Sequence, residues 1–193
     1  VGPGNIYVTL AKKILAGTVG IDMIAGPSEI LIIADEGARP DFIAADLLSQ
    51  AEHDVLSSAV LITDSQKLAK AVVGQITGQL EDLPRAEIAS ESLAKYGAVI
   101  VVRNIAVAVE IANRIAPEHL ELCVADPEAL LGKIRHAGAV FLGAWTPEAI
   151  GDYVGGPNHV LPTARSARFS SGLSVLDFMK RTTIAQITPG ALA

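Results

Sequence analysis

The chain has 193 residues, of which 50% are hydrophobic and 4% aromatic, and its formal net charge is −6 at pH 7. Lysines and arginines are scattered along the chain, which argues against nucleic-acid binding. Its apolar runs fall short of the roughly 20 residues that a membrane span needs, and no signal peptide is recognised. We therefore expect a cytoplasmic protein without a nucleic-acid or membrane partner.

The first predicted element is a helix over residues 6–16, preceded by a turn rich in glycine and proline over residues 1–5. Asn5 ends this turn, where its side chain can cap the helix. A glycine-rich turn before a helix can also bind a phosphate, so both interpretations remain open. The chain has no Gly-x-Gly-x-x-Gly sequence, the usual dinucleotide-binding fingerprint.

An aliphatic run over residues 30–34 predicts a buried strand, and a turn over residues 26–29 comes before it. A helix is predicted next, over residues 41–53, after a proline. Gln50 and His53 are three residues apart and would share one face of that helix. An amide oxygen and an imidazole there can hold a metal ion if other ligands lie nearby, although a polar helix end has the same residue types.

Strands and helices then alternate with short connections. We expect strands over residues 59–63, 98–102, 120–124 and 139–142, and helices over 65–80, 85–96, 105–115 and 127–136. This rhythm predicts an α/β fold, with a mostly parallel sheet and helices on both faces, Rossmann-like but incomplete. Cys123 falls within a predicted strand, so we interpret it as a buried, inert thiol. His136 would lie in the last turn of a helix, where a cation is favoured.

The pattern changes after Trp145. A short helix is predicted over residues 147–153, and a long irregular stretch rich in Gly, Pro, Ser and Arg follows over residues 155–174. Long loops of this kind are usually functional or disordered. Helix-like spacing resumes over residues 175–181, so the fold is expected to end in a long loop and a short helical tail.

Polar groups gather in four clusters, at residues 26–29, 50–53, 116–119 and 151–159. Because ligands of α/β sheets bind beyond the carboxyl ends of the strands, we expect these clusters to meet there. Imidazole together with carboxylate or amide oxygen suits zinc and similar divalent ions. The adjacent Glu118 and His119 follow a proline and can move protons near neutral pH, although a surface loop can have the same sequence.

Five segments in this order resemble the histidinol dehydrogenase family. They are Gly26 to Glu29, Leu47 to His53, Ala116 to Glu121, Gly156 to Thr163, and Phe169 to Ser174. The resemblance runs from Val1 to about Thr183. It implies an NAD-dependent oxidoreductase acting on a CH–OH group, which oxidises L-histidinol to L-histidine through an aldehyde with bound zinc and two NAD. These are the last steps of histidine biosynthesis.

The resemblance also implies a role for individual residues. The zinc ligands would be Gln50, His53 and Asp152, and the acid–base pair Glu118 and His119. His119 would take the alcohol proton, and Glu118 would help water attack the aldehyde. Asn5 corresponds to a position at the NAD site. Residues expected to contact the substrate are Ser28, Gln50, His53, His119, Asp152 and His159.

Members of the family are much longer than this chain, which begins at Val1 rather than Met. We therefore expect a truncated piece that is inactive alone, and a homodimer whose shared site takes a fourth zinc ligand from a C-terminal segment. Residues 1–28 would end an NAD-side domain, residues 29–174 form the α/β domain, and residues 175–193 begin the C-terminal segment. Two alternatives remain: a non-catalytic binding module, or a zinc hydrolase using Glu118, although no His-Glu-x-x-His sequence is present.

Overall fold

The computed structural model describes residues 4–191. Its body is a parallel sheet of five strands: β1 (Glu29–Ala34), β2 (Ser58–Thr63), β3 (Ala98–Val101), β4 (His119–Cys123) and β5 (Ala139–Leu142). The strands lie in the order β3-β2-β1-β4-β5, and each pairs with its neighbour in parallel. The predicted α/β fold is therefore confirmed.

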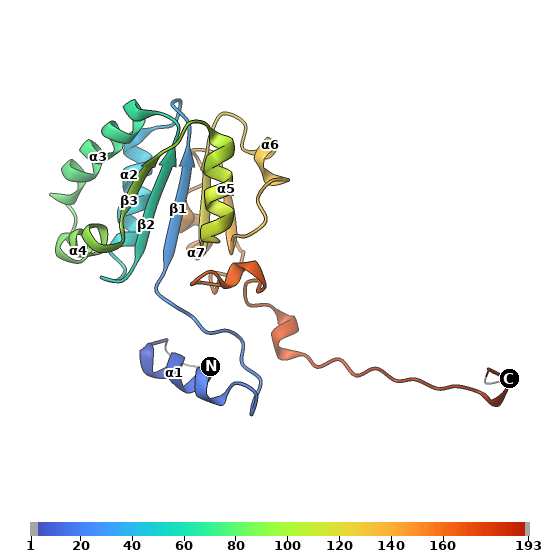
Figure 1. Ribbon diagram of the computed structural model, residues 1–193. Helices are drawn as coiled ribbons and strands as arrows, with labels where there is room; N and C mark the ends of the chain where they lie inside the picture. The colour runs from blue at the N-terminus through green and yellow to red at the C-terminus, as the bar shows by residue number, and fades with distance from the viewer. Residues whose placement is uncertain (1–3, 192–193) are drawn as a thin grey trace.

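Helices cover both faces of the sheet (Figure 1). The described helices are α1 (Ile6–Leu15), which lies apart from the sheet, α2 (Pro40–Ala51), α3 (Gln66–Leu80), α4 (Ala86–Tyr96), α5 (Ile105–Ile115), α6 (Glu128–Leu131) and α7 (Glu148–Tyr153). Short 3-10 turns follow at Ser166–Arg168, Val175–Phe178 and Pro189–Ala191. Helices α2, α3 and α4 pack on one face, and α5 packs on the other (Figure 1).

Strand β1 lies at the centre of the sheet and explains how the two layers form. Ile30 and Ile32 belong to the core under α2, whereas Leu31 and Ile33 belong to the core under α5. A central parallel strand is buried on both faces, so its sequence is a continuous aliphatic run rather than an alternating one. This is why the predicted strand agrees with the observed one to within a residue.

The connection from α5 to β4 brings the acid–base sequence to the sheet. The helix begins at Asn104, whose side chain accepts the N–H of Val107, and it ends at Ala116 in the left-handed conformation, with φ of 54°. A reversal at Ala116, followed by a proline, stops the helix and turns the chain into β4. Glu118 and His119 therefore lie where β4 starts.

Two predicted helices are shorter than expected. Helix α2 ends at Ala51, so His53 lies in the following turn, where its N–H donates to the carbonyl of Gln50 at 3.2 Å. Helix α6 also stops early, so His136 is not in a last helical turn. The side-chain oxygen of Asn113 accepts the N–H groups of Arg135 and His136, and these hydrogen bonds replace those that a longer helix would make.

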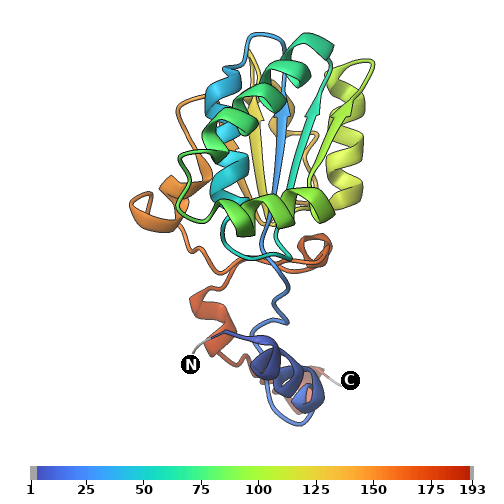
Figure 2. The ribbon, with the colours of Figure 1, turned by 90° about the vertical axis from the view of Figure 1, so that its left-hand side faces the viewer.

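The segments at the two ends of the described chain lie apart from the sheet (Figures 1 and 2). Asn5 caps α1 by accepting the N–H of Val8, and the preceding turn lies partly outside the described residues. Residues 175–181 form only one 3-10 turn, capped by Ser174, because the chain extends from Met179 onward. None of the described helices is long and apolar enough to cross a membrane.

Candidate active site

The predicted polar clusters meet at the amino ends of the strands, so the prediction of the carboxyl ends was wrong. Glu29 and His119 are the first residues of neighbouring strands, and Ile30 pairs with His119 in the register. Three of the clusters precede strands instead of following them, and the fourth begins on α7, after the last strand. Helix α2 runs back along the sheet, which returns Gln50 to the amino ends of the strands. At the opposite edge a hollow of about 650 Å³ contains none of the predicted site residues.

His119 is buried, and one of its ring nitrogens is fixed by the main chain. Nδ1 lies 3.0 Å from the carbonyl oxygen of Glu29. Because a carbonyl can only accept, Nδ1 carries the hydrogen and Nε2 keeps its lone pair. Nε2 is buried and has no hydrogen-bond partner among the described residues. Burial also lowers the pKa of His119, which favours this neutral form.

Glu118 is the second buried acid–base group at this edge. Its Oε2 accepts the main-chain N–H of Glu29 at 2.9 Å, so Glu29 holds both neighbours through its peptide groups. Burial, with a smaller effect from the nearby carboxylates of Glu29, Glu148 and Asp152, raises the pKa of Glu118 to about 8. The side chain can therefore hold or release a proton near neutral pH.

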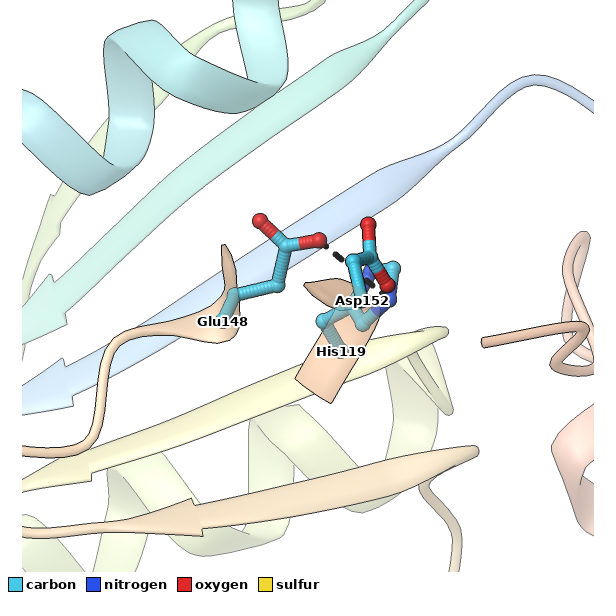
Figure 3. Close-up of side chains that lie close together, drawn as sticks. All are labelled: His119, Glu148 and Asp152. Carbon is cyan, nitrogen blue, oxygen red and sulfur yellow. Dashed lines mark ion pairs between the residues drawn. The ribbon is translucent and has the colours of Figure 1, made fainter. Parts of the chain in front are cut away.

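Two carboxyl groups of α7 face His119 (Figure 3). Oε1 of Glu148 lies 3.5 Å from His119 Nε2, and ligand atoms of His119, Glu148 and Asp152 all lie within 4.8 Å of one another. This group could hold a metal ion. Sequence reasoning missed Glu148, although it lies four residues before Asp152 on a predicted helix and so shares its face. Burial raises its pKa to about 7.

Gln50 and His53 approach the same place from the end of α2. Gln50 is only 1% exposed, and its Oε1 has no hydrogen-bond partner. Such an unpaired buried oxygen is unfavourable unless another group, such as a cation, binds it. His53 is exposed but close enough to His119 to lower its pKa, while Asp152 raises it. The structure thus brings His53, Glu118, His119 and Asp152 near one another, and it places Gln50 at the end of α2, on the same edge of the sheet.

Residues 1–193 all match the family model for histidinol dehydrogenase. The chain belongs to the histidinol dehydrogenase family. It is 65% identical to a histidinol dehydrogenase from Cereibacter sphaeroides over 191 residues, and 63% identical to one from Ruegeria pomeroyi over 191 residues. Each match covers 99% of this chain but 44% of the relative. The chain therefore spans less than half the length of these curated relatives.

Solved structures agree with this assignment. The crystal structure of histidinol dehydrogenase from Elizabethkingia anophelis matches 99% of this chain with a TM-score of 0.93 and 45% identity, and 44% of that chain is covered. Gamma-glutamyl phosphate reductase from Thermotoga maritima matches 74% of this chain and 41% of its own, with a TM-score of 0.50 and 15% identity. At that identity the second match indicates only a shared fold.

The structure describes the surroundings of the remaining predicted site residues, Ser28, His159 and Asn5, and of Cys123. Ser28 is half-buried before β1, and its carbonyl accepts the N–H of Ser58. His159 is exposed in the long loop, outside the group around His119. Asn5 caps α1, apart from the sheet. Cys123 is buried at the end of β4, and burial raises its pKa to about 12, as expected of an inert thiol.

Proposed function

We propose that this chain supplies the acid–base pair and most of the metal ligands of an NAD-dependent, zinc-containing histidinol dehydrogenase. The enzyme would oxidise L-histidinol to L-histidine through the aldehyde, at the end of histidine biosynthesis, in the cytoplasm. The observation that carries the proposal is the free, buried Nε2 of His119, which faces Glu148 and Asp152 beside Glu118. Family membership and the names of the relatives support it.

In this proposal His119 is the base of the first oxidation. Its Nε2 takes the hydroxyl proton of histidinol as a hydride leaves the carbon that bears the hydroxyl group. The product is the aldehyde. The carbonyl of Glu29 stabilises the imidazolium that forms, because Nδ1–H keeps its acceptor throughout. Bound NAD would supply the hydride acceptor for each of the two oxidations.

Glu118 acts in the second oxidation. As a carboxylate it takes a proton from water, and the resulting hydroxide adds to the aldehyde carbon. A second hydride then leaves that carbon, and the carboxylic acid so formed loses a proton to water to give the carboxylate of histidine. The N–H of Glu29 donates to Glu118 and so holds it at the amino ends of the strands while water adds and the hydride leaves.

We propose that Gln50, His53 and Asp152 bind the zinc ion. The unpaired Oε1 of Gln50 fits this role, since it is a buried oxygen without a hydrogen-bond donor. Zinc accepts such a mixture of imidazole, carboxylate and amide ligands, and would position histidinol through its imidazole and amino nitrogens. Asp152 belongs both to this ligand set and to the group with His119 and Glu148. Zinc measurements on variants must therefore show which of the two sets of residues binds the ion.

The other contacts extend this proposal. Ser28 and His159 would contact the substrate, and Asn5 would lie at the NAD site. A homodimer with a shared site is supported by apolar side chains that stand exposed on α1 and the tail, such as Tyr7, Leu176 and Phe178.

The test uses a full-length hybrid, in which residues 1–193 replace the matching part of the Cereibacter sphaeroides relative. We expect two NADH for each L-histidinol consumed, and dependence on zinc. Hydrolysis of esters or amides without NAD would instead support the zinc hydrolase, and histidinol binding without turnover would support the binding module.

Zinc titration of the 193-residue chain by calorimetry tests the ligand set directly. Binding that is strengthened by histidinol and weakened by His53→Ala would support the proposal. Absence of binding by a chain that is folded, as shown by circular dichroism, would mean that the site requires further segments. Equal binding by His53→Ala and the unaltered chain would contradict the assignment of His53.

A further inference from the structure

Glu121 is a buried carboxyl group at the centre of the sheet that the proposed chemistry does not use. It lies on β4 between β1 and β5, two residues after His119 and on the same face, and it is 1% exposed. An acidic side chain in such a place is costly unless it is hydrogen-bonded. Its partners are therefore informative.

Two other elements supply these partners. Oε1 of Glu121 accepts the main-chain N–H of Glu148, the first residue of α7, at 2.8 Å. Asp46, which lies on α2, lines the same small hollow as Glu121, next to Pro147 at the start of α7. Glu121 therefore connects β4 to α7 by a hydrogen bond and lies beside Asp46 of α2.

Asp46 and Glu148 each lie about one helical turn before a proposed metal ligand. Asp46 is four residues before Gln50 on α2, and Glu148 is four residues before Asp152 on α7, so each pair shares a helix face. Figure 3 shows the carboxyl groups of Glu148 and Asp152 beside the imidazole of His119. A shift of α7 relative to α2 would separate Asp152 from Gln50.

We propose that the Asp46–Glu121 carboxyl pair is a positioning pair, which fixes α7 against α2 so that Asp152 and Gln50 reach one metal ion beside His119. This inference rests on the proposed function. Apolar side chains of similar volume usually stabilise a core as well as buried polar pairs do, so packing alone does not explain two acids here. Glu121 also accepts the main-chain N–H of Glu148 at the start of α7, and a leucine cannot accept a hydrogen bond.

The experiment compares four proteins in the full-length hybrid. D46L/E121L removes both carboxyls, whereas D46N/E121Q keeps an amide pair with an oxygen for the N–H of Glu148. The matched control is N113L, which removes another buried side-chain acceptor of main-chain N–H groups, on the other face of the sheet. Zinc retained against a competing chelator is measured first, and KM and kcat for histidinol second.

We expect D46L/E121L to bind zinc about 10- to 100-fold more weakly, as usual when a group that orients ligands is lost. Its KM for histidinol should rise, and excess zinc should restore much of kcat. D46N/E121Q and N113L should retain zinc as the unaltered hybrid does. If D46L/E121L does not fold, D46N/E121Q decides, since weakened zinc binding in that folded variant would overturn the proposal.

Unchanged zinc binding by folded D46L/E121L would also overturn the positioning role. Failure of the unaltered hybrid to oxidise histidinol would overturn the proposed function instead. The two failures are distinguishable, because zinc retention is measured without substrate or turnover.

Discussion

The Nδ1 atom of His119 lies 3.0 Å from the main-chain carbonyl oxygen of Glu29. A main-chain acceptor cannot be removed by substituting a side chain, so the orientation of the imidazole is fixed by the pairing of β1 and β4. The position of the proton on Nδ1 follows from this contact, and it leaves Nε2 as the base.

His119→Asn tests this assignment. An asparagine nitrogen can replace Nδ1 as the donor to Glu29, but nothing replaces Nε2. We expect kcat for histidinol oxidation in the full-length hybrid to fall by about 10²- to 10⁴-fold, as is typical when a general base is lost. Zinc content, measured by metal analysis, should not change. Loss of zinc from this variant would show that His119 is itself a ligand, together with Glu148 and Asp152.

Gln50→Leu separates stability from metal binding. Leucine has a similar size and removes the unpaired buried Oε1, so the metal-free chain should gain about 1 kcal/mol of unfolding free energy in urea. Zinc affinity should fall, because an oxygen ligand is lost. The control is Gln79→Leu, since Gln79 is half-buried and donates to the carbonyl of Asp41, so its removal should destabilise the chain. If Gln50→Leu also destabilised the metal-free chain, the Oε1 of Gln50 could not be an unfavourable, unpaired oxygen there.

Gly151→Ala tests how closely α7 packs on β5. A Cβ at this position would lie 2.9 Å from the ring of Phe141, so α7 or the ring must move. We expect about 1–3 kcal/mol lower stability by chemical denaturation, and weaker zinc binding because Asp152 is the next residue. Gly74→Ala in α3 is the matched control, because no atom lies within 4 Å of the added carbon.

Gly74→Ala should stabilise the chain by up to about 1 kcal/mol, since alanine favours a helix over glycine. Equal changes in the free energy of unfolding for the two substitutions would mean that close packing against Phe141 does not require glycine at position 151.

The sequence predicts the strands well because a parallel sheet that is buried on both faces requires continuous aliphatic runs. Residues 30–34 are an example, since the predicted strand differs from β1 (Glu29–Ala34) by one residue. The position of the site was harder to predict. Whether a cluster meets others at the amino or carboxyl edge depends on how helices such as α2 return along the sheet, which is a property of the tertiary structure.

Individual site residues show the same limit. The adjacent Glu118 and His119 can be found from their residue types, and the structure places both beside Asp152. Glu148 was missed because its importance comes from the approach of α7 to β4. Its spacing from Asp152 places both residues on one helix face, but it does not show that this face meets His119. His53 was assigned to a helix face, but a turn holds it, since α2 ends two residues earlier.

The raised pKa of Glu118 predicts how the second oxidation depends on pH. Only the carboxylate can take a proton from water, and burial raises the pKa to about 8, so at neutral pH most of the side chain is protonated. We expect kcat for oxidation of the aldehyde to rise with pH and to level off above about 8. Glu118→Gln should remove this rise and lower kcat, whereas a rise that persists in the variant would assign it to another group.

The same group makes the metal-free chain less stable as the pH increases. Below pH 4.5, the ordinary pKa of a glutamate, Glu118 is protonated in both the folded and the unfolded state. Between 4.5 and about 8 only the unfolded state releases the proton, so the free energy of unfolding falls, by about 1.4 kcal/mol per pH unit for one such group. Glu118→Gln should therefore reduce the slope of stability against pH in this range, measured by urea unfolding with a chelator present. An unchanged slope would show that Glu118 ionises in the folded chain as readily as in the unfolded one.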